Sequence, residues 1–112
     1  MTIQEELEVE LRKYADEHPD LILPEWIKRK IEGVNFDYSS DVCDTIAKLL
    51  GKIIELEIEH GKQRGEHIVI ARIHNIKPFK FGHEISTNQP EKLPAIQVAL
   101  TTLLREENEK GN

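Results

Sequence analysis

The feature that most restricts the fold is a short stretch in which apolar residues and glutamates alternate strictly. From Ile54 to Glu59 each apolar residue is followed by a glutamate, and glycines stand on both sides of the stretch. This alternation has the period of a β-strand with one buried and one exposed face. On a helix extended to Gly61, Glu57 would lie in the middle of the apolar face. The pattern therefore favours a strand over residues 52–60, with the continuous helix as the alternative.

A second strand-like run follows after a short loop that has a glycine at each end. Residues His67–Ile76 are rich in β-branched side chains, which favour strands. We therefore predict an antiparallel hairpin that pairs residues 53–59 with residues 66–75. A third short strand is compatible with Phe79–Phe81, and the polar residues 82–90 are expected to form a loop.

Helices are predicted before the hairpin. Thr2 and Glu5 have the spacing of a capping box, so a first helix is expected to begin there and to end before Pro19. Residues 24–33 are compatible with a second helix that has a proline in its first turn. A third helix would begin after a polar cap, for which the candidates are Ser39, Ser40 and Asp41. Its expected buried stripe consists of Val42, Ile46, Leu49 and Leu50.

A last helix is predicted after the hairpin, with Pro94 in its first turn. Its expected core face consists of Ile96, Ala99, Leu100, Leu103 and Leu104. Residues 106–112 are polar and are expected to form a frayed tail. The whole pattern predicts one compact α+β domain over residues 1–105, with two or three helices before a central antiparallel hairpin and one helix after it.

Cysteine usage and hydropathy indicate the setting of the chain. The single cysteine, Cys43, excludes an internal disulfide and lies in an apolar helical pattern typical of a buried residue. The first fourteen residues carry four glutamates, unlike a secretory signal. Apolar runs are far shorter than the roughly 18–20 residues that cross a bilayer. We therefore expect a cytoplasmic protein without a membrane partner.

Positive charge is concentrated in residues 62–83, although the net charge of the chain is −6. Basic residues on a protruding two-stranded ribbon can neutralise phosphates, and aromatic side chains between them can stack on bases. The predicted nucleic-acid-binding residues are Lys62, Arg64, Arg72, Lys77, Lys80 and Phe79. The alternative is that the lysines protect a sheet edge from aggregation while the phenylalanines belong to the core.

Histidines and possible nucleophiles give no catalytic or metal pattern. Four of the five histidines lie within residues 60–83, but His67 and His74 would point to opposite faces of one strand. Only His60 and His67 could meet across the hairpin, which gives two ligands at most. Metal-binding, nucleotide-binding and nucleophile motifs are absent. The sequence therefore predicts no enzyme, no metal, no cofactor and no catalytic residues.

The acidic residues suggest a second kind of function. Glu55, Glu57 and Glu59 would line one face of a strand. This face is either a solvated surface, a contact surface for a partner protein, or an acidic surface that imitates a nucleic-acid backbone. The alternative to nucleic-acid binding is thus an acidic regulatory or inhibitory module that binds a partner protein through its helical N-terminal half. An exposed edge at Phe79–Phe81 would also favour a homodimer.

Overall fold

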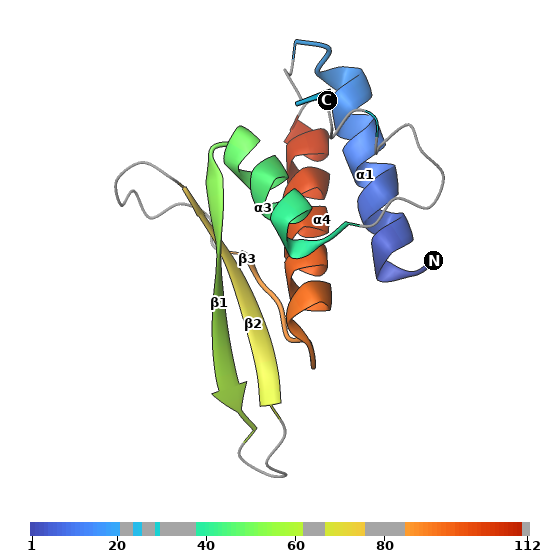
Figure 1. The fold of residues 1–112 in the computed structure, drawn as a ribbon. Coiled ribbons are helices and arrows are strands. Elements are labelled where there is room, and N and C mark those ends of the chain that lie inside the picture. The colour runs from blue at the N-terminus through green and yellow to red at the C-terminus, as the bar shows by residue number, and fades with distance from the viewer. Residues whose placement is uncertain (21–23, 26–28, 30–37, 62–66, 76–84, 111–112) are drawn as a thin grey trace.

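The computed structural model describes residues 1–20, 24–25, 29, 38–61, 67–75 and 85–110 (Figure 1). Its elements follow in the order α1 (Ile3–Glu17), α3 (Ser40–Leu49), β1 (Lys52–His60), β2 (His67–Asn75), β3 (Ile85–Ser86) and α4 (Lys92–Lys110). Helices precede and follow one antiparallel sheet, so the predicted α+β class is confirmed. The helices in this part of the chain are all too short or too polar to span a membrane.

Helix α1 begins and ends where its sequence signals predict. The Thr2 hydroxyl accepts a hydrogen bond from the Glu5 backbone N–H at 3.2 Å, which satisfies one of the free donors of the first turn. Leu7 and Leu11, one turn apart, are fully buried on the same face. The helix ends at Glu17, directly before the His18 cap and the proline that cannot continue it.

Helix α3 starts after Ser39, whose hydroxyl accepts from the backbone N–H of Val42. The predicted stripe is buried at Val42 and Ile46, but the prediction is wrong for Leu49, which keeps 37 % of its surface exposed. Leu49 is the last residue of the helix. Two residues later Gly51 adopts a φ of 74°, and there the chain turns into β1. The left-handed backbone at Gly51 favours glycine because a Cβ atom strains it. The helix predicted over residues 24–33 lies largely outside the described residues.

The hairpin has the predicted antiparallel pairing, with β1 one residue longer at each end than predicted and β2 beginning one residue later. Residues 52–60 form strand β1, so the helical alternative is excluded, and β1 pairs antiparallel with β2 from Lys52 opposite Asn75 to His60 opposite His67. The sheet order is β1-β2-β3. The Phe79–Phe81 strand lies outside the described residues.

The loop predicted over residues 82–90 is only partly a loop. Ile85 and Ser86 form β3 beside β2, and Gln89 exchanges two backbone hydrogen bonds with Val69, at 2.7 and 3.1 Å. Between these points the Thr87 hydroxyl accepts from the Ala71 backbone N–H and donates to the Ala95 carbonyl of α4. A two-residue strand has no sequence period to reveal it, and its pairing depends on the finished edge of β2.

Helix α4 carries the predicted core face, and all five of its residues are buried. A frayed tail is predicted for residues 106–112, but α4 continues to Lys110. The prediction is therefore wrong for residues 106–110. Asn108, 1 % exposed, donates from Nδ2 to the backbone carbonyl of Glu10 at 3.2 Å and to its carboxylate at 2.9 Å. Arg105 also contacts the Glu10 carboxylate, at 3.4 Å. These contacts hold the polar end of α4 against α1.

The molecule has two layers, with the helices on one side of the sheet (Figure 1). Helix α1 packs on α4, α4 packs mainly on β2, and α3 packs on the start of β1. We call the side of the sheet toward the helices the inner face and the opposite side the outer face. The inner face of β2 supplies Val69, Ala71 and Ile73 to the core. Directly opposite residues of an antiparallel pair share a face, so the inner face of β1 carries Ile58, Leu56 and Ile54.

Candidate functional site

The predicted nucleic-acid-binding residues fall mostly outside the described part of the chain. This applies to Lys62, Arg64, Lys77, Phe79 and Lys80. Arg72 is described, and it lies on the outer face of β2 opposite Glu55. Its guanidinium forms an ion pair with the carboxylate of Glu57 on the neighbouring strand. A guanidinium engaged in this way has less to offer a phosphate, because binding would first break a contact with a carboxylate.

The outer face of β1 is acidic, as the alternation predicts. Glu55, Glu57 and Glu59 lie on this face in consecutive outer positions, and all three are exposed. Beside them on β2 lie Arg72, which is paired with Glu57, and the imidazole of His74, whose Nε2 lies 3.3 Å from a carboxylate oxygen of Glu55. No ion pair is assigned to Glu59 within the described segments. The described outer face therefore carries excess negative charge, which attracts basic partners and repels phosphates.

The inner face of β1 changes character along its length. Ile54, near the start of the strand, packs against the core beneath α3. Leu56 and Ile58 lie further along the same face but remain 40 % and 50 % exposed. Their partners on β2, Ala71 and Val69, are buried at the same levels of the sheet. The inner face of β2 is thus covered from Val69 to Ile73, whereas the second half of β1 is left open.

Two exposed apolar side chains on a core-type face form the strongest unexplained feature of the described surface. Single exposed hydrophobics are common, but here both point toward the side of the sheet that is elsewhere buried. The alternation of β1 identified the face correctly. Exposure was not predictable from it, because exposure depends on how far α3 and α4 extend across the sheet.

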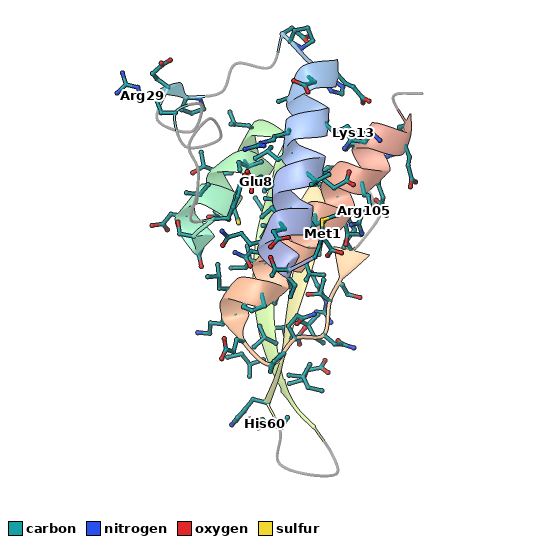
Figure 2. All side chains as sticks on the ribbon, turned by 90° about the vertical axis from the view of Figure 1, so that its right-hand side faces the viewer. Met1, Glu8, Lys13, Arg29, His60 and Arg105 are labelled. Carbon is teal, nitrogen blue, oxygen red and sulfur yellow. The ribbon has the colours of Figure 1, made fainter. Side chains whose placement is uncertain are left out.

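The histidines are arranged as the strand geometry requires. His60 and His67 face each other at the end of the hairpin, with ring centroids 4.6 Å apart, and Figure 2 shows His60 at the far end from α1. His74 lies on the outer face, on the opposite side of the strand from His67. Among the described residues no group of three or more potential ligands could hold a metal ion.

The single cysteine is a core residue. Cys43 is fully buried in α3, and its thiol donates to the backbone carbonyl of Tyr38 at 3.6 Å. The same carbonyl accepts from Nε2 of the buried Gln97 at 3.0 Å. A buried thiol that donates to a backbone carbonyl behaves as a small, weakly polar core residue. The Ser39 hydroxyl close to it in sequence caps α3.

Tyr38 is the largest fully buried side chain of the described core. Burial raises the pKa of its phenol well above the usual value of 10, and the nearby carboxylate of Glu8 adds to the rise. The Glu8 carboxylate is itself held by Arg12 at 2.5 Å, one turn along α1. A phenol that is held neutral in this way contributes its bulk to the core.

Comparison with known proteins gives no match, since no family model, curated protein or solved structure is significantly similar to this chain.

Proposed function

We propose that this chain is a non-catalytic binding module that contacts a partner protein with the exposed second half of strand β1. The observation that carries the proposal is the exposure of Leu56 and Ile58 on the inner face of the sheet. The surface offered to the partner consists of these two side chains and the acidic outer residues Glu55, Glu57 and Glu59. We call these five residues the β1 surface.

The apolar part of the β1 surface favours a protein partner on energetic grounds. Full burial of a Leu or Ile side chain contributes about 1.5–3 kcal/mol relative to exposure. Leu56 and Ile58 are each about half exposed, so covering both would contribute about 1.5–3 kcal/mol in total. The centre of a protein interface is typically built from apolar side chains that the partner covers in this way.

The charged part of the β1 surface favours a basic partner over a nucleic acid. Three glutamates lie on the outer face of one strand, and Arg72, the described cation near them on β2, is already paired with Glu57. Like charges across an interface cost free energy, whereas a positive partner surface would be attracted. Nucleic-acid binding through Lys62, Arg64 and Lys80 stays a prediction, and a salt series of DNA and RNA binding tests it.

The proposal places the contact on β1 and not on the helical N-terminal half. Leu7 and Leu11 supply the buried apolar face of α1, and this face packs on α4. The apolar residues of α3 are likewise buried, apart from Leu49 at its end. Helices whose apolar faces are already covered have little left for a partner.

A pair of matched variants tests the proposal. Ile58→Ser changes the β1 surface, whereas Val9→Ser changes an equally exposed residue of α1, 49 % against 50 %. Each protein is immobilised and incubated with lysate of the source cells, and the bound proteins are quantified by mass spectrometry. We expect at least one bound protein to be lost with Ile58→Ser and retained with Val9→Ser. Retention of every bound protein by both variants would contradict the proposal.

A further inference from the structure

The two strands of the hairpin differ at their backbone edges. The far edge of β2 is occupied, because β3 and Gln89 pair with it and Thr87 accepts from its Ala71 N–H. β1 has β2 on one side and, within the described segments, no strand on the other. Every second residue of a strand directs its backbone N–H and C=O toward one edge. The nine-residue strand β1 therefore presents a row of backbone donors and acceptors along its open edge, the edge that points away from β2.

The side chains beside this open edge alternate in chemistry as well as in direction. Leu56 and Ile58 stand on the inner face, and Glu55, Glu57 and Glu59 stand on the outer face. A strand added next to β1 would continue the same two faces. Its inner residues would cover Leu56 and Ile58, and its outer residues would lie beside the glutamates, where basic side chains pair best.

We propose that β1 receives an extended segment of a partner protein as an additional strand, and that this segment alternates apolar and basic residues. The inference rests on the proposed function and specifies how the partner binds. Main-chain hydrogen bonds to the open edge would supply affinity, and the alternation of the two faces would supply specificity.

A second copy of this chain fits the edge less well. Two β1 strands paired antiparallel about a twofold axis would keep both helix layers on one side and place apolar residues opposite apolar residues. The same registers place glutamates opposite glutamates, for example Glu55 opposite Glu59 of the second copy. Like charges directly opposite each other destabilise a strand pair. The acidic outer face thus disfavours self-pairing and favours a basic strand.

The test uses synthetic peptides of about seven residues, a common strand length. The probe alternates lysine and valine. A scrambled peptide of the same composition keeps the charge but loses the alternation. A third peptide carries N-methyl groups on two successive central amides, one on each edge of the strand, so that neither edge can pair fully. Calorimetry measures binding of each peptide to the full chain.

We expect the alternating peptide to bind and the other two to bind about tenfold more weakly, because main-chain pairing or face matching is lost. Amide hydrogen exchange monitored by NMR gives an independent readout. Binding of the alternating peptide should slow exchange at every second residue of β1, at the amides that point away from β2. Docking through side chains alone would leave these amides unprotected.

Matched protein variants locate the contact. Glu59→Lys reverses a charge on β1, and Glu17→Lys makes the same change at an exposed position of α1. Ile58→Ser and Val9→Ser form the apolar pair. We expect each β1 variant to weaken binding of the alternating peptide about fivefold, and each α1 variant to leave it within about twofold.

Three outcomes would overturn the inference. Equal binding of the alternating and scrambled peptides would mean general attraction of cations to an acidic protein. Protection of the outward β1 amides without peptide, together with a dimer by light scattering, would identify a second copy as the occupant. Loss of a cellular partner with Ile58→Ser, but no binding of the alternating peptide, would leave the proposed function standing and reject strand addition.

Discussion

The two long strands of the sheet have the same length and the same pairing but opposite surroundings. Along β2 the inner residues Val69, Ala71 and Ile73 are buried beneath α4. Along β1 the equivalent inner residues become exposed after Ile54. β2 is also paired on both edges, whereas β1 is paired on one in the described part of the chain. The difference shows that alternation selects the face of a strand, and that neighbouring elements decide whether the face is covered.

The largest expected effect is the difference in unfolding free energy between the same Ile→Ala substitution made on β2 and on β1. Ile73→Ala, on the inner face of β2, removes a side chain that is 1 % exposed and should cost about 2–5 kcal/mol of unfolding free energy. Ile58→Ala, on the inner face of β1, should cost less than about 1 kcal/mol because the side chain is half in water. Urea unfolding followed by circular dichroism measures both. Equal losses would mean that β1 is covered as well as β2.

The occupied edge of β2 gives the next effect. Thr87→Val removes the hydroxyl that accepts from the Ala71 N–H and donates to the Ala95 carbonyl. The substitution leaves buried groups without these partners and should cost about 1–3 kcal/mol by the same measurement. Thr102→Val is the control, since that hydroxyl donates only back to the Val98 carbonyl of its own helix, at 2.8 Å. The control should change stability by less than about 0.5 kcal/mol.

Alkaline pH should lower the free energy of unfolding through Tyr38, which lies in the covered core. Burial raises the pKa of its phenol above the usual value of 10, so the folded state holds the proton more tightly than the unfolded state. This contribution is fully present below pH 10 and is lost as the pH rises further, by about 1.4 kcal/mol for each pH unit at most. Tyr38→Phe should flatten this decline in urea unfolding series. A decline of unchanged slope would assign it to other groups, among them Tyr14, whose pKa burial also raises.

The smallest effect belongs to the exposed pair that joins the two strands. Arg72 and Glu57 are both partly exposed, so their ion pair should contribute about 0.2–1 kcal/mol. A double-mutant cycle with Arg72→Ala and Glu57→Ala measures this coupling, which should fall as salt screens the charges. A coupling that is insensitive to salt would indicate a contact shielded from water.

Local patterns predicted the elements of this fold well. The Thr2 and Ser39 caps and the alternation of β1 act within a few residues, and the structure has the helix starts and the strand that they predict. The core face of α4 follows from its helical period in the same way. Such signals depend on the backbone geometry of one element, and a single sequence displays them directly.

The features that were missed depend on contacts between distant parts of the chain. The end of α4 remains helical because Asn108 bonds to Glu10, 98 residues earlier. β3 exists because β2 offers it an edge, and Arg72 meets Glu57 because the hairpin brings them together. Exposure of Leu56 and Ile58 depends on where the helices end across the sheet. A pattern of residue types carries none of these distances.

The packing of α1 on α4 has a consequence for the order of events during synthesis. The first helix emerges from the ribosome long before the helix that buries Leu7 and Leu11 has been translated. Until then its apolar face has no native partner, and the hairpin likewise lacks most of the helix layer that covers it. The native core can therefore close only after α4 has emerged, and the contacts that bury the apolar face of α1 form only at that stage.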